Sequence, residues 1–374
     1  ILYSCSNSVK IEGITNEVEV LRDNFGINHI YANNQDDLFF MQGYLAAKDR
    51  LFQFEIWRRQ ATGTVSEIFG EKELDRDIGT RLFKFRGDIK DELNHYHKDG
   101  YNIVSSFVSG INKYIEEVNS NPELLPIEFE ILGIKPEIWT NEVVISRHQG
   151  LLGNIDQELN IGRAVSLIGE KRVKELMWFH PKEPSIKLDK KITYDDLKQD
   201  ILRLYNAYRT PIKFKREYVL DKYKSKELIA NINKPNIISD TYSIGSNNWA
   251  LSGDKSFNGF PILANDPHRS LSNPSLRYMA HLVAPGWNVI GGGEPEIPGI
   301  SIGHNGIGAW GLTVFRTDAE DLYVYELNPS NLNEYKHNGQ WKKFDKINET
   351  IKVKNKDDVD VELLYSVHGP VTLV

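Results

Sequence analysis

The chain has 374 residues, of which 40% are hydrophobic, 26% are charged and 11% are aromatic. This composition is typical of a globular protein large enough for two or three domains, and it excludes disordered, collagen-like and coiled-coil chains. The formal net charge is −7, so the chain lacks the basic surface that a nucleic-acid backbone requires, and we expect no nucleic-acid partner. No run of about 18 apolar residues occurs, so we predict no membrane-spanning helix.

The sequence contains a single cysteine, Cys5. One cysteine excludes an internal disulfide and a cysteine-based zinc site. The segment Leu2-Tyr3-Ser4-Cys5 resembles the end of a bacterial lipoprotein signal, in which the cysteine carries a lipid. Two alternatives are therefore open: Cys5 anchors the protein to a membrane, or it is a free thiol in a frayed terminus.

The first two hundred residues are expected to open with a short pair of strands and then to be mostly helical. Apolar residues recur at steps of three and four in 40–54 and again in 103–118, which is the pattern of an amphipathic helix. Further helices are predicted over about 141–169 and 193–208. Asn121-Pro122 and Lys135-Pro136 mark breaks between helices.

A basic polar stretch, 213–234, separates this half from the next. It has seven lysine or arginine residues and three acidic ones, and we interpret it as a linker. Short strand-like runs follow, separated by clusters of Gly, Pro, Asn and Asp. They occupy 249–251, 260–263, 287–290, 321–327 and 360–367. Helices first and strands later predict an α+β fold rather than an alternating βαβ sheet.

One serine motif has the form of a nucleophile elbow. The sequence lacks the P-loop, the HExxH zinc motif and a dinucleotide-binding glycine motif, but 299–303 fits G-x-S-x-G around Ser301. An elbow needs a helix after the serine, whereas 304–311 is glycine-rich and strand-like, so a turn between strands is favoured. The α/β-hydrolase alternative would use Ser301 as the nucleophile and His337 or His368 as the base.

A second serine motif lies where the linker meets the strand-rich half. The segments are LRDNFGINHIYA at 21–32, QGY at 42–44, AKDRLFQ at 47–53, GSNNW at 245–249, NDPH at 265–268, PGISIGHN at 298–305 and AWGLT at 309–313. In this order they resemble the penicillin acylase family of N-terminal nucleophile hydrolases over nearly the whole chain. The resemblance implies an α+β fold of αββα layers and an amidohydrolase activity.

The resemblance also implies self-cleavage between Gly245 and Ser246. A serine hydroxyl needs a base, and in this family the base is the serine's own α-amine, which the cleavage frees. Glycine before the cut fits because a residue without Cβ tolerates a strained backbone. Ser246 would then attack an amide and form an acyl-enzyme that water releases. The alternative is an ordinary serine in a turn.

Two further residues are implied to stabilise the reacting oxyanion. Val314 falls where the family supplies a backbone N–H to the oxyanion hole. His268 falls where a residue contacts the serine's amine and the oxyanion hole through main-chain or ring atoms. A histidine here resembles the acyl-homoserine-lactone and cephalosporin acylase branches, because the penicillin G branch has glutamine.

A structural calcium ion is the cofactor that the resemblance implies, and no organic cofactor is expected. Asp318 and Asp321 match two of the family's ligand positions, Glu158 matches the ligand from the small subunit, and the carbonyl of Glu320 would add another oxygen. Carboxylate and carbonyl oxygens are the ligands that Ca²⁺ prefers. The alternative is that 318–321 is a solvated charge run.

The substrate is expected to be a small-molecule amide of the β-lactam or N-acyl-homoserine-lactone type. The family's acyl pocket corresponds here to His148, Leu151, Leu152, Arg269 and Arg316. The penicillin G branch has aromatic residues at the two arginine positions. An inward arginine would favour a polar or carboxylate-bearing acyl group, whereas an arginine directed to solvent would carry no such implication.

By the same resemblance, 1–209 is small-subunit-like, 210–245 is a spacer that ends at the cleavage site, and 246–374 begins the large subunit. The family's large subunit continues several hundred residues beyond its serine. We therefore expect that the remainder of this subunit is a partner that this chain lacks, and that the chain as it stands is inactive or nearly so.

We expect a periplasmic or cell-envelope location in a bacterium. A last alternative is a catalytically silent envelope or binding protein of the same fold.

Overall fold

The computed structural model describes residues 8–146, 153–179, 182–224, 245–268, 272–314 and 318–374. These residues fall into two compact units. The first lies within Ile1–Arg58, Phe85–Ile145 and Phe214–Val314, and the second within Arg59–Lys84, Ser146–Lys213 and Phe315–Val374. Each unit therefore draws on segments from both sides of the Gly245–Ser246 bond. No described helix is both long and apolar enough to cross a membrane.

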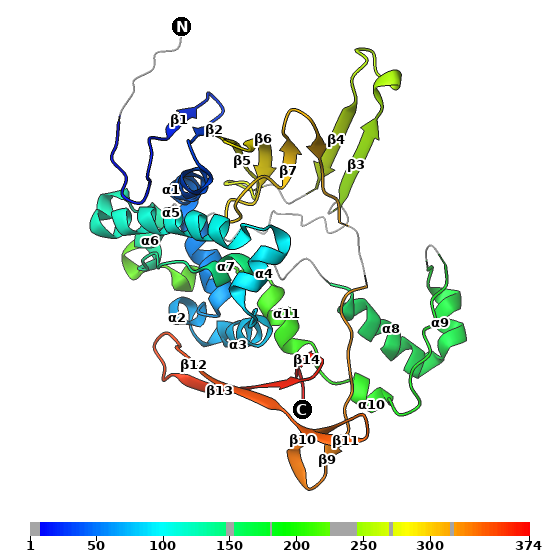
Figure 1. Cartoon of the computed structure of the whole chain (residues 1–374). Helices are drawn as coiled ribbons and strands as arrows, with labels where there is room; N and C mark the ends of the chain where they lie inside the picture. The colour runs from blue at the N-terminus through cyan, green and yellow to red at the C-terminus, as the bar shows by residue number, and fades with distance from the viewer. Residues whose placement is uncertain (1–7, 147–152, 180–181, 225–244, 269–271, 315–317) are drawn as a thin grey trace. The chain divides into compact units, whose positions relative to one another are not determined.

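Helices dominate the first part of the chain and strands the last (Figure 1). The helices are α1 (Gln35–Thr62), α2 (Ser66–Phe69), α3 (Leu74–Phe83), α4 (Ile89–Tyr96), α5 (Gly100–Ser120), α6 (Ile127–Leu132), α7 (Asn141–Ser146), α8 (Ile155–Ile168), α9 (Glu170–Leu176), α10 (Tyr194–Leu197) and α11 (Arg203–Arg209). The strands are β1 (Glu19–Arg22), β2 (Asn28–Tyr31), β3 (Ser246–Leu251), β4 (Ile262–Pro267), β5 (Tyr278–Ala284), β6 (Trp287–Gly293), β7 (Ile302–His304), β8 (Ala309–Trp310), β9 (Leu327–Asn328), β10 (Asn331–His337), β11 (Gln340–Lys343), β12 (Asp345–Ile351), β13 (Val359–Ser366) and β14 (Gly369–Pro370). The predicted α+β class and the opening strand pair are confirmed.

Three predicted segments differ from the structure. The helical stretch expected over about 141–169 contains α7 and α8, and residues 153–154 belong to neither helix. The helix expected over 193–208 is divided into α10 and α11. The strand expected over 321–327 forms a ladder only at its end, in β9. In place of a strand ladder, the rings of Tyr323 and Tyr325 stack on His368, with ring centroids 3.8 Å and 5.9 Å from it. Tyr323 and Tyr325 alternate in the sequence as strand residues do, but in the structure they stack on His368 instead of pairing with a neighbouring strand.

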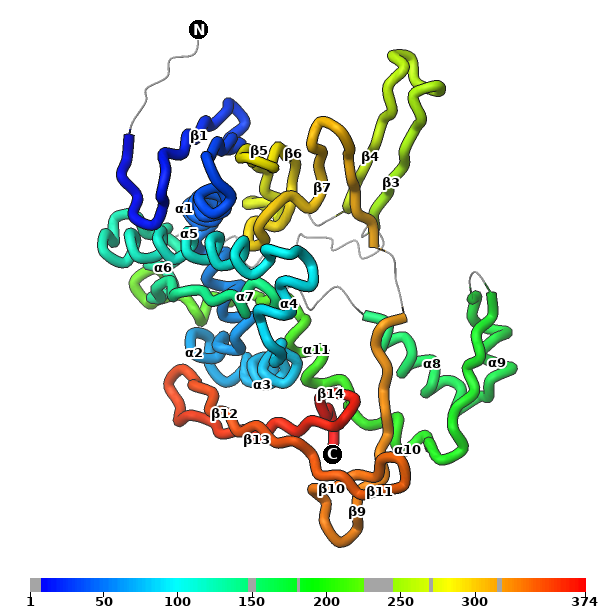
Figure 2. Tube along the Cα trace, in the orientation of Figure 1, coloured from blue at the N-terminus to red at the C-terminus, as the bar shows by residue number. Residues whose placement is uncertain are grey.

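The main sheet of the first unit joins segments from both ends of the sequence. Its strand order is β1-β2-β5-β6-β7-β8. β2 pairs with β5 in parallel, and the register places His29 opposite His281, so strands far apart in sequence lie side by side (Figure 2). The other pairings in this sheet are antiparallel. The sheet therefore closes a loop of about 250 residues, and its register places residues together that no local pattern connects.

Helix α1 covers one face of this sheet and packs on α5. The Trp287 ring of β6 contacts Phe39 edge to face, at a centroid distance of 5.0 Å, and its Nε1–H donates to Gln35 Oε1. The two helices approach closely at two glycines: a Cβ on Gly43 or Gly110 would lie about 2 Å from a backbone carbonyl of the other helix. Only glycine permits this crossing, because any side chain would separate the helix backbones.

Strands β3 and β4 form a separate two-stranded ribbon in the first unit. The pairing is antiparallel, runs from Ser246↔Pro267 to Leu251↔Ile262, and extends as a long hairpin (Figure 1). The register places the first residue of β3 beside the last residue of β4. Residues 246–248 of the GSNNW segment thereby pair with residues 265–267 of the NDPH segment.

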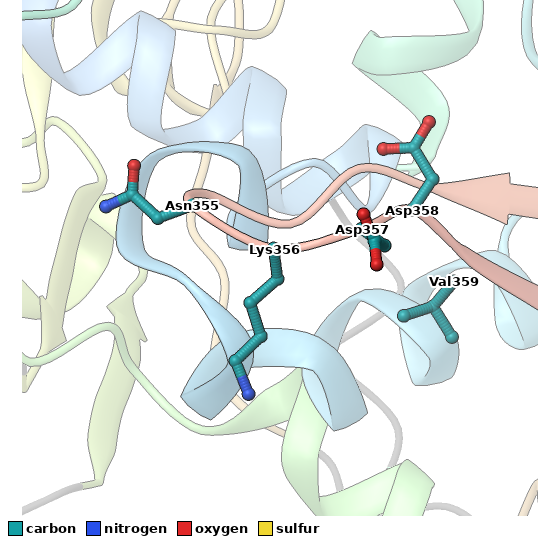
Figure 3. Close-up of a pocket in the computed structure, with 5 residues that line it drawn as sticks. All are labelled: Asn355, Lys356, Asp357, Asp358 and Val359. Atoms are coloured by element: carbon teal, nitrogen blue, oxygen red, sulfur yellow. The ribbon is translucent and has the colours of Figure 1, made fainter.

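The second unit combines a helical core with two small sheets. The core is formed by α8, α10, α11 and the segment before α11, through Ile155, Leu159, Leu197, Leu202 and Tyr205. The sheets have the orders β11-β10-β9 and β12-β13-β14. A shallow hollow at the turn between β12 and β13 is lined by 355–359 (Figure 3). This hollow contains none of the residues singled out from the sequence.

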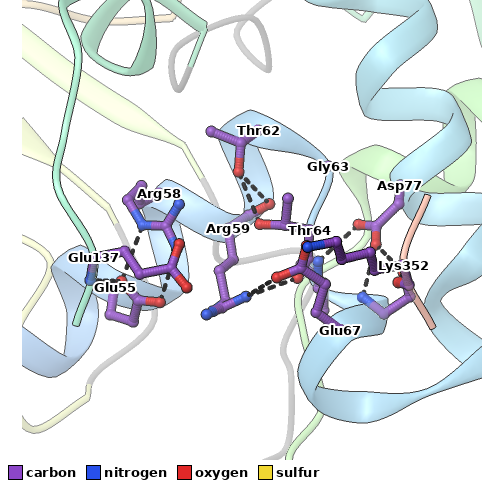
Figure 4. Close-up of polar contacts among 12 residues, drawn as sticks. Glu55, Arg58, Arg59, Thr62, Gly63, Thr64, Glu67, Asp77, Glu137 and Lys352 are labelled. Atoms are coloured by element: carbon purple, nitrogen blue, oxygen red, sulfur yellow. Dashed lines mark hydrogen bonds and ion pairs between the residues drawn. The ribbon is translucent and has the colours of Figure 1, made fainter. Parts of the chain in front are cut away.

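Asp77 of α3 is a fully buried carboxyl in the second unit. It accepts hydrogen bonds from Val65 N at 3.0 Å, from Ser66 N at 2.6 Å and from Ser66 Oγ at 2.5 Å (Figure 4). The Ser66 hydroxyl also donates to the carbonyl of Lys352 at 2.9 Å. Burial outweighs these donors and raises the pKa of Asp77 to about 6. The carboxyl therefore binds its proton more tightly in the folded state than in the unfolded chain.

This difference predicts a pH-dependent stability. The pKa of Asp77 is higher in the folded protein than in the unfolded chain. Its stabilising contribution to the free energy of unfolding is therefore fully present below about pH 4. About 3 kcal/mol of this contribution is lost as the pH rises through 6. Urea unfolding of wild type and Asp77→Asn should show a free-energy difference that shrinks by roughly this amount between pH 4 and pH 7. Asp75→Asn, at a half-exposed position of the same helix whose carboxylate pairs with Arg203, should leave this pH dependence unchanged. A difference that stays constant with pH would contradict the prediction.

Candidate active site

Ser246 is the first residue of β3, and its hydroxyl contacts the peptide group that precedes it. The Gly245 carbonyl oxygen accepts two hydrogen bonds, from Ser246 Oγ at 2.6 Å and from the backbone N–H of His268 at 2.8 Å. The second bond continues the β3–β4 ladder one residue beyond Ser246↔Pro267. A nucleophilic oxygen and a backbone donor thus meet at the carbonyl of the predicted cleavage site.

The His268 side chain lies beside the same peptide group. Its Nε2–H donates to Asp266 Oδ2 at 2.8 Å. Its Nδ1 is on the side of Gly245, since a Cβ built on that glycine would lie 3.6 Å from it. Asp266 therefore sets the orientation of the ring and directs Nδ1 toward the Gly245–Ser246 segment.

Asn265 connects this ribbon to the segment that carries Val314. Its Nδ2 donates to the carbonyl of Leu312 at 3.0 Å, and its Oδ1 accepts from the Leu312 N–H at 3.2 Å. The two bonds imitate a strand pairing and hold Leu312 against β4, two residues before Val314. The structure therefore supports placing His268 and the 312–314 segment around one ribbon, while the role of Val314 itself stays a prediction.

Asn265 and Asp266 were missed as individual functional residues by sequence reasoning. Both belong to the NDPH segment, so the signal was present, but an Asn-Asp-Pro sequence is also an ordinary turn. Asn265 acts through its hydrogen bonds to Leu312, which is 47 residues away, and Asp266 acts through the ring of His268, which is two residues away.

The predicted calcium ligands converge in the second unit. One carboxylate oxygen from each of Glu158, Asp318 and Asp321 lies within 4.8 Å of the others. Asn154, just before α8, donates from Nδ2 to Glu158 Oε1 at 2.9 Å, to Asp318 Oδ1 at 3.0 Å and to the Glu320 carbonyl at 2.8 Å. An amide NH₂ has two hydrogens for these three acceptors. Three oxygens of the cluster thus share one amide group as their donor.

The electrostatics of this cluster favour a cation. Burial raises the pKa of Glu158, and the neighbouring Asp318 and Asp321 carboxylates raise it further. The Glu320 carboxylate accepts a hydrogen bond from the hydroxyl of Tyr205, at 2.8 Å from Oε2. An all-oxygen set of carboxylates and a carbonyl fits Ca²⁺. Sequence reasoning did not identify Asn154, because its spacing to Asp318 is 164 residues.

The predicted pocket residues lie outside the described part of the chain. This applies to His148, Leu151, Leu152, Arg269 and Arg316, and also to Cys5. Their roles stay predictions.

Ser301 does not occupy a nucleophile elbow. It is followed directly by β7, which forms a hairpin with β8, whereas an elbow serine is followed by a helix. Gly299 before it has φ = +87°, so the glycine serves a turn between strands. This agrees with the favoured interpretation of the motif.

Comparison with protein families identifies the family of the chain. The penicillin amidase family profile matches residues 17–373. The chain belongs to the penicillin amidase family. The predicted family membership is thereby confirmed, and with it the α+β class of N-terminal nucleophile hydrolases.

Curated members of the penicillin amidase family match nearly the whole chain. Penicillin G acylase of Escherichia coli is 28% identical over 403 residues, which cover 99% of this chain and 47% of that protein. Penicillin acylase 2 proenzyme of Pseudomonas sp. (strain SE83) is 28% identical, covering 98% and 45%. Acyl-homoserine lactone acylase QuiP of Pseudomonas aeruginosa is 25% identical, covering 96% and 40%. The chain thus spans less than half the length of these relatives.

Among solved structures, thermostable penicillin G acylase from Alcaligenes faecalis in tetragonal form matches 47% of this chain and 98% of its own chain, with 27% identity and a TM-score of 0.40. Members of the penicillin amidase family named in these comparisons are acylases of two kinds, acting on penicillins or on acyl-homoserine lactones.

Proposed function

We propose that this protein is an amidohydrolase whose nucleophile is Ser246, exposed as an N-terminal residue when the chain cleaves itself between Gly245 and Ser246. The observation that carries the proposal is the Gly245 carbonyl, which accepts hydrogen bonds from both Ser246 Oγ and the His268 N–H. Membership of the penicillin amidase family supports it independently.

The cleavage is an acyl shift followed by hydrolysis. Ser246 Oγ attacks the carbonyl carbon of Gly245, and the His268 N–H stabilises the negative charge on the carbonyl oxygen. The C–N bond breaks, the nitrogen takes the proton that the hydroxyl gave up, and an ester joins Gly245 to Oγ. Water hydrolyses this ester and leaves a carboxylate on Gly245 and a free α-amine on Ser246. The relative named a proenzyme fits such a maturation step.

In the mature protein the α-amine of Ser246 acts as the base for its own hydroxyl. Oγ attacks the substrate's acyl carbon, and the α-ammonium group returns the proton to the leaving amine. Water then releases the acyl group by the same sequence. Backbone N–H groups of His268 and Val314 are the proposed oxyanion donors on this chain, with Asn265 holding the segment that leads to Val314.

The proposed substrate class is an N-acylated β-lactam or an N-acyl-homoserine lactone. Both share a small amine-bearing ring joined to an acyl chain by an amide. The relatives named in the comparisons act on these two kinds of compound. Within the proposal, the acyl group would be bound by the region of His148, Leu151, Leu152, Arg269 and Arg316, and a carboxylate-bearing acyl group would pair with an arginine.

Calcium is proposed as a structural ion held by Glu158, Asp318, Asp321 and the Glu320 carbonyl. The convergence of their oxygens and the raised pKa of Glu158 support this assignment. The ion would neutralise three carboxylates and connect α8 to the 318–321 segment.

A periplasmic or cell-envelope location, with lipid attached at Cys5, is also proposed, on the strength of the Leu2–Cys5 sequence alone.

The experiment that tests the proposed maturation is intact-mass spectrometry of the protein from its complete reading frame. Wild type should yield two chains, one of which begins at Ser246, and Ser246→Ala should yield one uncut chain. Ser252→Ala, at the end of the same ribbon, should be cut like wild type. An uncut wild-type chain would overturn the proposal in favour of a catalytically silent envelope or binding protein.

A further inference from the structure

Two histidines face each other across the parallel strands β2 and β5. The register pairs His29 with His281, and their rings meet edge to face with centroids 5.2 Å apart. The neighbours Ile30 and Leu282 are buried, at 1% and 0% exposure, on the sheet face that α1 covers. The alternation of side chains along a strand therefore places both imidazoles on the opposite face. The His29 side chain is 24% exposed, so small ions can reach it.

The same nitrogen of each ring points at the other ring. His29 Nδ1 and His281 Nδ1 are 3.0 Å apart. The opposite nitrogens face oxygens that only accept: His29 Nε2 lies 3.6 Å from Asp23 Oδ2, and His281 Nε2 donates to Asn288 Oδ1 at 3.1 Å. Asp23 is held in place because its Oδ1 accepts from two backbone N–H groups of the β1–β2 turn.

These contacts favour one placement of the ring protons, on the two Nε2 atoms. A neutral imidazole carries one N–H, and an acceptor beside one nitrogen draws the proton to that nitrogen. With the protons of His29 and His281 on Nε2, both Nδ1 atoms present lone pairs to one another. Two bare lone pairs at this distance repel, so the contact is favourable when either a proton or a metal ion lies between the two Nδ1 atoms.

We propose that His29 and His281 bind a transition-metal ion of the Zn²⁺ or Cu²⁺ type through their Nδ1 atoms. Imidazole nitrogen suits these ions. Two nitrogens bound to one zinc ion at about 2.0–2.1 Å are roughly 2.9 Å apart for a right angle at the metal and roughly 3.4 Å apart for a tetrahedral angle. The observed 3.0 Å separation lies within this interval. Water would fill the remaining coordination positions.

The groups beside the outer nitrogens of the two rings are also of the kind found around metal sites. Metal-binding histidines usually donate their other N–H to a carboxylate, a carbonyl or water, which orients the ring and raises its basicity. Asp23 and Asn288 occupy these positions for His29 and His281. The site is distinct from the proposed calcium cluster, whose ligands are all oxygens, and it includes none of the residues assigned to Ser246 chemistry. It would clamp β2, from the start of the chain, to β5.

Isothermal titration of the 374-residue chain with Zn²⁺ tests the proposal. Calcium is kept saturating, so that the carboxylate cluster does not compete for zinc. Wild type should show one zinc site, and His29→Gln and His281→Gln should each weaken it by about tenfold or more. His95→Gln, which removes an exposed histidine of α4, should bind zinc like wild type.

A second measurement does not depend on whether the variants fold. In wild type labelled with ¹⁵N, the Nδ1 resonances of His29 and His281 should shift together during the zinc titration, while their Nε2 resonances keep the N–H signature. Unchanged Nδ1 resonances, or zinc affinity that survives in both single variants, would overturn the proposal. A proton shared between the two rings with no response to zinc would also overturn it.

Discussion

Ser246→Ala is expected to reduce amide hydrolysis by at least about three orders of magnitude. The substitution removes the hydroxyl oxygen that contacts the Gly245 carbonyl, and with it the acyl-enzyme. It also prevents the cleavage that frees the α-amine, so both the nucleophile and its base are lost. The measurement is release of free amine from an N-acylated β-lactam and from an N-acyl-homoserine lactone, with protein from the complete reading frame.

The matched control for this prediction is Ser301→Ala. Ser301 belongs to the rival serine motif, but a strand rather than a helix follows it, so its removal should change the rate by less than about threefold. The reverse pattern, with activity lost in Ser301→Ala and kept in Ser246→Ala, would contradict the assigned nucleophile. The intact masses of the same samples separate a failure of cleavage from a failure of hydrolysis.

Calcium is expected to raise the stability of the second unit substantially. Binding to the folded state alone contributes about 2.7 kcal/mol when free Ca²⁺ is one hundred times its Kd. Removing calcium with a chelator should therefore lower the midpoint of thermal unfolding by several degrees, and adding calcium should restore it. Asp318→Asn should abolish this response, because it removes one of three convergent carboxylates and leaves the others in place.

Asp156→Asn is the control for the calcium prediction. Asp156 is an exposed carboxylate in the first turn of α8, close in sequence to Glu158 but not a member of the convergent group. It should keep the full response to calcium and to the chelator. An Asp156→Asn response as small as that of Asp318→Asn would show that general charge, not the proposed site, binds the ion.

The amphipathic helices were predictable because their signal is local. The step of three and four residues in 103–118 is a property of the helix repeat, and α5 buries that face. The same step in 40–54 correctly indicates a helix, but α1 is buried on nearly all sides there and is kinked at Arg50, so its sequence pattern did not determine one buried face. The position of the proposed nucleophile was also readable, because Gly245 and Ser246 are adjacent and the segments around them are distinctive. The ordering of helices before strands needed no tertiary information either.

The sequence by itself therefore determined the buried face of α5, the family of the chain and the residue types available for chemistry. The tertiary structure decided which of these residues meet. Asn154 reaches Asp318 across 164 residues, and His29 reaches His281 across 252. The reason is physical: helix periodicity is set within a few residues, whereas strand register and loop closure depend on contacts between distant segments. Only the pairing of β2 with β5 brings the two imidazoles within coordinating distance of one ion.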